Sequence, residues 1–234
     1  MSSMHDKSIW FNDNIQYIFH KNIVEYDMNA ASVSVCERFK LLTDSEIEKL
    51  KLMPKDQRTR WMGLKQQDKE FSQQLLSGIR EIRRKFIELN GLSEHNILSL
   101  HSDAIDFIRT KEVITEIEGV TFKQSFECNS YIRYHNIEIF YQDGVIKYKN
   151  IPKDILNQHT LGLNKHIIAF CDRIDNYDTD ILRFISKFQR QYLQDKLPEY
   201  YYIPFGTTGT FKMENLQLLA YFANIAIQEV KSWR

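Results

Sequence analysis

The sequence contains little cysteine, proline or glycine, and its charges cancel. Its 234 residues include 3 Cys, 4 Pro and 8 Gly, and the formal net charge is +0 at pH 7. The widely spaced cysteines form no CxxC pair, which indicates a reducing compartment and no zinc site. So few prolines and glycines leave little room for a flexible linker. Neutrality argues mildly against a nucleic-acid-binding protein, although local patches matter more than the total charge.

Long hydrophobic runs are also missing. No stretch approaches the roughly 20 apolar residues that a membrane span needs, and no apolar run follows Met1–Asp6 as it would in a signal peptide. We therefore expect a protein of the cytoplasm without a membrane partner. Hydrophobic residues make up 43% of the chain and charged residues 26%, which is the balance of an ordinary globular protein with a substantial core.

The segment Ile97–Arg109 predicts a β-hairpin, because two arms rich in Ile, Leu and Phe flank a polar turn that contains Asp103. A carboxylate at the tip of a buried hairpin is costly unless it faces a cation. A second carboxylate, Asp27, ends the short apolar strand predicted over Ile23–Asp27, and a helix over Ala30–Leu42 follows. Ligands commonly lie just beyond strand ends in such units. Our hypothesis is that the fold brings Asp27 and Asp103 together.

The rest of the chain alternates between helical and β-rich patterns. Residues 8–22 predict a lead-in segment, and Thr43–Glu46 is a capping box that begins a short helix. Residues 56–90 carry one apolar stripe at helical spacing and predict the longest helix, in which Gly78 marks a break or a close-packing point. The predicted strands that follow are Val113–Val120, Thr121–Cys128, Ser130–Tyr141 and Val145–Lys149, with a hairpin turn at Asp143-Gly144. Helices are predicted from about Asp154 on, over Asp178–Leu197 and over Met213–Trp233, so the fold class is α+β.

Two carboxylates from different strands suit Mg²⁺ or Mn²⁺, because these ions prefer oxygen ligands. A pair of such ions serves phosphoryl transfer: one eases the deprotonation of a 3′-hydroxyl, and the other holds a triphosphate. Cations of the helix over residues 56–90 would contact the triphosphate oxygens, over which charge spreads during transfer. The basic residues on the polar faces of that helix are Arg58, Arg60, Lys65, Lys69, Arg80, Arg83, Arg84 and Lys85.

Simpler interpretations of the same residues stay open. An Asp in a polar turn usually bonds to its own backbone. The basic side chains of a long helix usually form a solvated face, here partly paired with Asp68, Glu70, Glu81 and Glu88. The seven histidines show no spacing typical of a metal site.

Two motifs resemble those of DNA polymerase palm domains. Glu25–Ser34 resembles the first palm motif, in which a strand ends in a catalytic Asp and a helix follows. Ser99–Ile105 resembles the third palm motif, the hairpin that carries the other catalytic Asp. The order of helix and hairpin from Phe71 to Ile108 is similar to the palm of family B polymerases. Ser130–Tyr134, with Lys147 and Lys149 after a turn, is similar to the basic-Tyr segment with which that family holds the primer end.

The resemblance implies an α+β palm-like sheet with a long helix between the two Asp motifs. Residues 1–155 would form a palm-like catalytic core with reduced fingers, and residues 156–234 a helical, thumb-like region. The implied activity is template-dependent nucleotidyl transfer with two metal ions, Mg²⁺ or Mn²⁺, held by Asp27, Asp103 and the backbone of Met28. The implied dNTP-binding residues are Arg58, Arg60 and Lys65, and those implied for the DNA primer–template are Arg133, Tyr134, Lys147 and Lys149.

The sequence also departs from the family B pattern. Ile105 stands where that family usually has a second hairpin Asp, and the Tyr-Gly of the fingers motif is missing. The chain is far shorter than a full polymerase, which suggests a reduced or split polymerase of phage type, acting in the host cytoplasm, with a further polymerase subunit as partner. An alternative is a catalytically inactive polymerase-like subunit that binds nucleic acid or a partner protein. A third interpretation is an unrelated α+β protein with coincidentally placed Asp residues.

Overall fold

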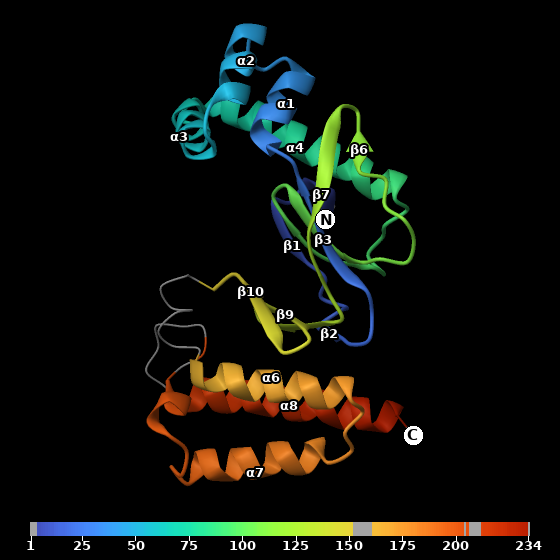
Figure 1. The fold of residues 1–234 in the computed structure, drawn as a ribbon, viewed down its shortest axis with the longest axis vertical. Coiled ribbons are helices and arrows are strands. Elements are labelled where there is room, and N and C mark those ends of the chain that lie inside the picture. The colour runs from blue at the N-terminus through green and yellow to red at the C-terminus, as the bar shows by residue number, and fades with distance from the viewer. Residues whose placement is uncertain (1–3, 152–160, 204, 206–211, 234) are drawn as a thin grey trace. The chain divides into compact units, whose positions relative to one another are not determined.

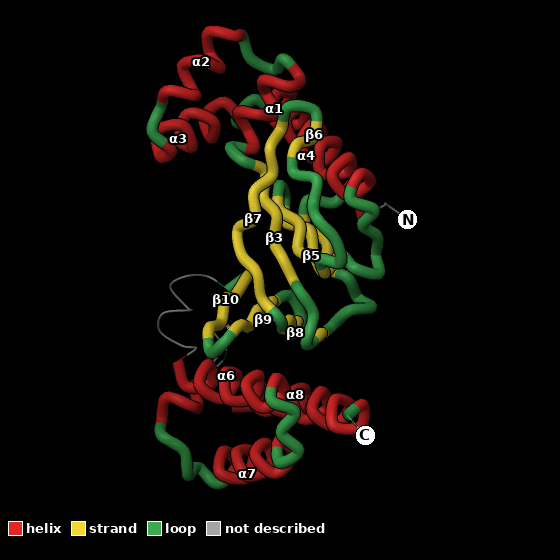
Figure 2. Tube along the Cα trace, turned by 45° about the vertical axis from the view of Figure 1, so that its right-hand side comes forward, coloured by secondary structure: helices red, strands yellow, loops and turns green. Residues whose placement is uncertain are grey.

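The computed structural model describes residues 4–151, 161–203, 205 and 212–233 (Figures 1 and 2). Among these residues the chain forms two antiparallel sheets, seven α-helices and two short 3₁₀ helices, η1 (Met4–Asp6) and η2 (Glu199–Tyr202). The expected α+β class is therefore confirmed. No helix in these ranges is long and apolar enough to cross a membrane.

Contacts between residues divide the chain into two compact units. The first consists of Met1–Asn14 and Asn22–Glu127, and the second of Ile15–Lys21 and Cys128–Arg234. We expected a division after residue 155, whereas the contacts group the strands of residues 130–149 with the C-terminal helices. Each unit has its own cluster of buried hydrophobic side chains.

The sheet of the first unit has the strand order β1-β4-β5-β3-β7-β6. Its strands are β1 (Ile9–Phe11), β3 (Ile23–Met28), β4 (Ile97–His101), β5 (Ala104–Ile108), β6 (Glu116–Ile117) and β7 (Val120–Cys128). The predicted hairpin is confirmed: β4 and β5 pair antiparallel, and His101 lies opposite Ala104 across a two-residue turn. β3 pairs antiparallel with β5, from Ile23 opposite Ile108 to Asp27 opposite Ala104. The strand predicted to end in Asp27 thus lies directly beside the predicted hairpin.

Four helices complete the first unit: α1 (Ala31–Phe39), α2 (Asp44–Leu52), α3 (Lys55–Lys65) and α4 (Lys69–Leu89). Figure 1 shows α1, α2 and α3 gathered near one end of α4. The apolar stripe of α4 packs on the sheet, where the Phe86 ring contacts the rings of Tyr26, Phe107 and Phe122 at centroid distances of 4.2–6.2 Å. α2 begins with the predicted capping box, in which the Thr43 side chain accepts from the Glu46 amide.

The second unit packs a four-stranded sheet, with the order β10-β9-β8-β2, against helices. Its strands are β2 (Tyr17–Ile18), β8 (Ser130–Tyr134), β9 (Ile137–Gln142) and β10 (Val145–Lys149), and its helices are α6 (Leu161–Asp175), α7 (Ile181–Leu193) and α8 (Lys212–Ser232). The Asp143-Gly144 turn joins β9 to β10 as predicted, and both residues have positive φ, 47° and 78°.

Four predicted elements need correction. The strand predicted over Val113–Val120 is only the two-residue strand β6, because the chain turns at Glu118 and Gly119, which have φ values of 49° and 84°, before β7 begins. Residues 56–90 form two helices, because Asp68 caps the start of α4 by accepting from the amides of Glu70 and Phe71. Residues 130–141 form two strands, because the chain turns at His135, which has a φ of 55°. Residues 8–22 contribute β1 to one sheet and β2 to the other, since strands this short leave too weak a pattern to recognise in the sequence. The start predicted for the helical region, residues 154–160, lies outside the described residues.

Candidate functional site

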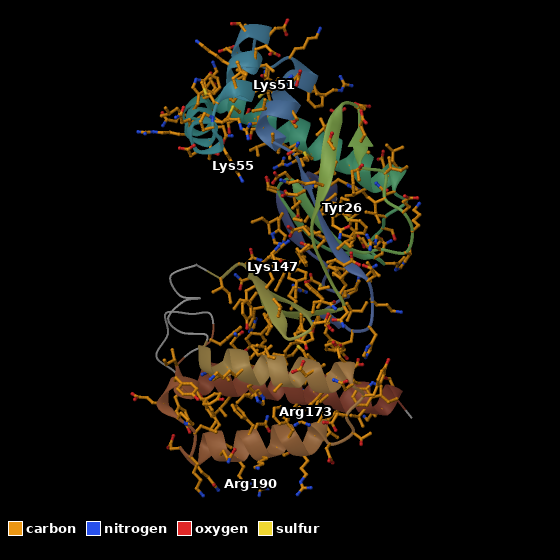
Figure 3. The ribbon with its side chains drawn as sticks, viewed as in Figure 1. Tyr26, Lys51, Lys55, Lys147, Arg173 and Arg190 are labelled. Atoms are coloured by element: carbon orange, nitrogen blue, oxygen red, sulfur yellow. The ribbon has the colours of Figure 1, made fainter. Side chains whose placement is uncertain are left out.

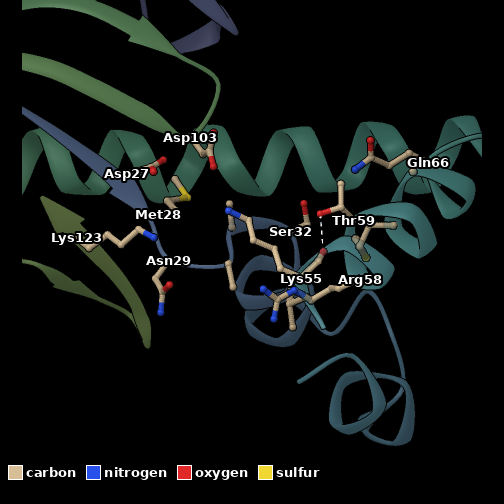
Figure 4. A pocket seen from close by; sticks show the side chains of 15 residues that line it. Asp27, Met28, Asn29, Ser32, Lys55, Arg58, Thr59, Gln66, Asp103 and Lys123 are labelled. Carbon is tan, nitrogen blue, oxygen red and sulfur yellow. Dashed lines mark hydrogen bonds between the residues drawn. The ribbon is translucent and has the colours of Figure 1, made fainter. Parts of the chain in front are cut away.

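Asp27 and Asp103 lie side by side at one end of the first sheet. Asp27 is the partner of Ala104 in the β3–β5 ladder, and the Met28 amide donates to the carbonyl of Asp103 at 3.2 Å. Both Asp side chains are half-buried, and both line a pocket of about 610 Å³ whose lining residues all belong to the first unit (Figure 4). The pairing of β3 with the β4–β5 hairpin is therefore what brings the two predicted Asp residues together.

Cationic side chains line other parts of this pocket. Lys55 and Arg58 come from the first turns of α3, and Lys123 comes from β7 (Figures 3 and 4). Lys123 lies beside Asp27. The Asn29 amide donates to the Thr121 carbonyl, so the ends of the two segments are close together, and Figure 4 shows the side chains of Lys123 and Asp27 on the same side of the pocket. The further lining residues are Met28, Asn29, Ala30, Ala31, Ser32, Val33, Thr59, Met62, Gly63 and Gln66.

The N-termini of two helices also open into this pocket. α1 follows Ala30, which has a left-handed backbone with φ 49° and ψ 44° and provides no side-chain cap. α3 follows Pro54, which likewise provides no side-chain cap. The first amides of a helix lack an intrahelical partner and carry partial positive charge. Together with Lys55 and Arg58, they make this wall of the pocket suited to an anion such as a phosphate group.

The carboxyl of Asp103 is in an environment that disfavours its charge. Burial raises its pKa, and the nearby charge of Glu25 raises it further, whereas a backbone hydrogen bond and the charge of Arg83 act in the opposite direction. Glu25, two residues before Asp27 on β3, accepts a hydrogen bond from Ser125 Oγ at 2.7 Å. Neighbouring carboxylates in a partly buried site repel one another, and a bound cation would relieve this repulsion.

Arg83 on α4 binds the backbone of the hairpin turn. Its side chain is completely buried, and burial lowers its pKa to about 10. Nη1 donates to the Ser102 carbonyl at 2.7 Å, and Nη2 donates to the carbonyls of His5 and Lys7. The Ser102 amide in turn donates to the carbonyl of Ser8. Interpreting Arg83 as part of a solvated basic face was therefore wrong: periodicity alone does not show which polar side chain meets carbonyl groups inside the protein.

Of the residues predicted to hold the triphosphate, Arg58 lines the pocket with Asp27, Met28 and Asp103, whereas Arg60 and Lys65 do not. The Lys65 ammonium lies 3.8 Å from Glu46 and 5.9 Å from the ring centroids of both Trp61 and Phe71. Lys55 and Lys123 were not among the predicted site residues. A signal for Lys55 existed, since it follows Pro54 and a proline commonly marks the start of a helix.

The residues predicted to hold the primer lie in the sheet of the second unit. Arg133 lies opposite Glu138, which lies opposite Lys149, and Lys147 lies opposite Phe140 two positions along the same strands. This register places Arg133, Lys147 and Lys149 on one face of the sheet. Tyr134 belongs to the other face, where its ring contacts Tyr221 at a centroid distance of 5.5 Å.

Comparison with known proteins gives one family. Residues 1–233 match the model of the family described as Bacteriophage PBS1 gene 130 protein. No curated protein matches the chain.

Proposed function

The chain belongs to the Bacteriophage PBS1 gene 130 protein family, and we propose that it is a template-dependent nucleotidyltransferase of the DNA polymerase type. The observation that carries this proposal is the register that sets Asp27 beside the Asp103 turn in a pocket with cationic walls. A strand that ends in Asp beside a hairpin that carries a second Asp is the arrangement that the resemblance of Glu25–Ser34 and Ser99–Ile105 to palm motifs implies.

The chemistry of the donor groups fits Mg²⁺ or Mn²⁺. Asp27 and Asp103 would hold the ion with carboxylate oxygens, and Met28 with its carbonyl; hard divalent cations prefer such ligands. A bound cation would offset the burial and the charge of Glu25 that raise the pKa of Asp103. When bound, the ions would lower the pKa of the attacking 3′-hydroxyl and stabilise charge on the transferred phosphoryl group.

The opposite wall would bind the triphosphate of a dNTP. Lys55 and Arg58 would donate to its oxygens, and the uncapped N-terminus of α1 would add backbone N–H groups. This would hold the α-phosphate near the two Asp residues, where the 3′-oxygen, after losing its proton to solvent, would bond to the α-phosphorus as the bond to pyrophosphate breaks. Arg60 and Lys65, predicted for the same task, have no place in this proposal because they do not line the pocket.

The residues that we propose for contact with DNA all lie in the second unit. Arg133, Lys147 and Lys149 share one sheet face, on which the buried Glu138 lies between Arg133 and Lys149, and the three positive charges suit the phosphates of a DNA strand. Tyr134 would not contact the DNA itself, because its ring packs on Tyr221 on the opposite face of the sheet. It would act through Arg133, its neighbour on β8.

A second candidate function is that of a catalytically inactive, polymerase-like subunit that binds nucleic acid or a partner polymerase subunit. One observation favours it: Ile105, at the position of a second hairpin Asp, is completely buried in the hydrophobic core. The next residue, Asp106, accepts from Ser99 Oγ at 2.7 Å and does not line the pocket. The hairpin thus offers the pocket a single carboxylate.

A primer-extension assay with Mg²⁺ or Mn²⁺ distinguishes the two functions. We expect extension by the wild-type protein and none by Asp27→Asn or Asp103→Asn. Asp143→Asn is the matched control, because Asp143 lies in a hairpin turn of the second unit where Asn tolerates the same backbone. No extension by a wild-type protein that binds the metal ion would reject the enzyme and favour the inactive subunit.

A further inference from the structure

We propose that Arg83 is a positioning residue of the candidate site: it fixes the Ser102-Asp103 turn so that the Asp103 carboxylate stays directed into the pocket. This inference rests on the proposed function, in which Asp103 of this turn binds a metal ion. It concerns a residue that does not line the pocket and would touch neither the metal ion nor the nucleotide.

The first argument is the number and origin of the carbonyls that Arg83 binds. Its guanidinium joins the carbonyl of Ser102 to those of His5, in η1, and Lys7, just after η1, almost a hundred residues earlier in the chain. The Ser8 carbonyl then binds the Ser102 amide. Both backbone groups of Ser102 are therefore held, one by Arg83 and one by the segment that Arg83 anchors.

The second argument is energetic. A completely buried guanidinium is costly unless hydrogen bonds and charges compensate it, and three carbonyls compensate it only in part. An apolar side chain in the same space would leave the carbonyls of Ser102, His5 and Lys7 without this donor, so the guanidinium has a task at the turn. Ser102 also has a φ of 53°, a strained conformation for a residue other than glycine, which persists only where the surroundings hold it.

The third argument is the link from the turn to Asp27. The Asp103 carbonyl, next along the chain from the carbonyl that Arg83 holds, accepts from the Met28 amide at 3.2 Å. Movement of the turn would therefore disturb the position of Asp103 and its connection to the strand end that carries Asp27. Holding Ser102 fixes the separation of the two carboxylates.

Native-state hydrogen exchange and Mn²⁺ titration together test this inference. The variants are Arg83→Gln, which keeps two donors but no charge, and Arg83→Lys, which keeps the charge and serves as the second variant if Arg83→Gln does not fold. Arg84→Gln is the matched control, since Arg84 lies on the exposed side of α4 and pairs with Glu88 at 2.9 Å. We expect faster exchange at the Ser102 and Met28 amides in Arg83→Gln, with unchanged exchange at Val24, which lies near the other end of β3 opposite Phe107.

Mn²⁺ affinity should fall about tenfold in Arg83→Gln, as is typical when a residue that supports a metal ligand is removed. Arg83→Lys should recover part of the loss, and Arg84→Gln should bind like the wild type. An unchanged exchange rate at the Ser102 amide of Arg83→Gln would overturn the inference. Faster exchange there with an unchanged Mn²⁺ affinity would also overturn it. Failure of the proposed function would look different: the wild-type protein itself would bind no Mn²⁺, which would overturn the site together with this task for Arg83.

Discussion

Arg83 Nη1 donates a 2.7 Å hydrogen bond to the carbonyl of Ser102, the residue before Asp103. The bond connects a helix in the core of the first unit to the tip of the hairpin that carries one of the two candidate ligands. α4 thus contributes in two ways: its apolar stripe, with Phe86, packs on the sheet, and its one fully buried cation among the described residues holds the turn. The geometry of the site depends on both.

The backbone of Ser102 gives the first prediction. At a φ of 53° the Cβ of a side chain has a steric cost of about 1 kcal/mol or more, which a glycine avoids. Glycine in turn loses more conformational entropy on folding, which offsets part of this gain. We expect Ser102→Gly to raise the free energy of unfolding by up to about 1 kcal/mol and Ser102→Val to lower it by a similar amount. Urea denaturation of both variants measures this, and a glycine variant less stable than the valine variant would show that the turn has another conformation.

Neighbouring arginines on α3 give the second prediction. Arg58 lines the pocket and Arg60 does not, because residues two apart on a helix point to different sides. Loss of a charge-assisted hydrogen bond costs about 1.5–3 kcal/mol, so we expect Arg58→Met and Lys55→Met each to weaken nucleoside triphosphate binding by about tenfold or more. Fluorescence titration with a labelled triphosphate measures the change, with Arg60→Met as the control. An equal loss of triphosphate affinity in Arg58→Met and Arg60→Met would show that the total positive charge matters and that Arg58 makes no specific contact with a phosphate.

Two glycines in neighbouring helices give the third prediction. A Cβ at Gly78 would lie 2.6 Å from Val35 Cγ1 and 3.0 Å from the Phe39 ring, whereas a Cβ at Gly63 would meet nothing within 4 Å. We expect Gly78→Ala to lower the free energy of unfolding by about 1–3 kcal/mol through overpacking of α4 against α1. Gly63→Ala should raise it by about 1 kcal/mol through helix propensity. Equal stabilisation of both variants would disprove the close approach of the two helices.

His166 in the second unit gives a pH dependence. Its ring stacks on Phe188 and Phe184 at centroid distances of 3.7 and 4.9 Å, and neither ring nitrogen has a hydrogen-bond partner among the described residues. Burial lowers its pKa to about 3. Below the usual pKa of about 6.5 the unfolded chain therefore binds a proton that the folded protein does not, and stability falls as the pH falls from about 6.5 towards 3.

The matched variant for this effect is His166→Leu, which replaces the titratable imidazole with an apolar side chain. Between pH 7 and pH 5 the wild-type protein should lose about 2 kcal/mol more stability than His166→Leu does. Denaturant unfolding at the two pH values measures the difference. Equal losses in both proteins would mean that the imidazole is solvated and titrates normally when folded.

Strong local patterns made much of the fold predictable. The two arms of the Asp103 hairpin, the Thr43 capping box and the Asp143-Gly144 turn each depend on residues within a few positions of one another, and all three form as predicted. The two-residue strand β2 has no such pattern, because its partner β8 lies more than a hundred residues later in the chain. The break before α4 was missed because the stripe continues across Asp68 while the helix does not.

The candidate site was predictable where a residue type and a strand end coincided, as at Asp27 and Asp103. It was not predictable where a partner comes from another segment. Lys123 joins the pocket only because β7 pairs beside β3, and Arg83 differs from Arg84 only in which side of α4 meets the carbonyls of the N-terminal segment. Such differences depend on tertiary packing, which a helical pattern of charges does not encode.

Mn²⁺ binding followed by electron paramagnetic resonance tests the central claim, that Asp27 and Asp103 together form a divalent-cation site. We expect the wild-type protein and the Asp143→Asn control to bind Mn²⁺ with equal affinity. Asp27→Asn and Asp103→Asn should each bind at least about tenfold more weakly with unchanged circular dichroism, since each loses a charged ligand. Wild-type affinity in either variant, or no binding by the wild-type protein, would contradict the two-carboxylate site.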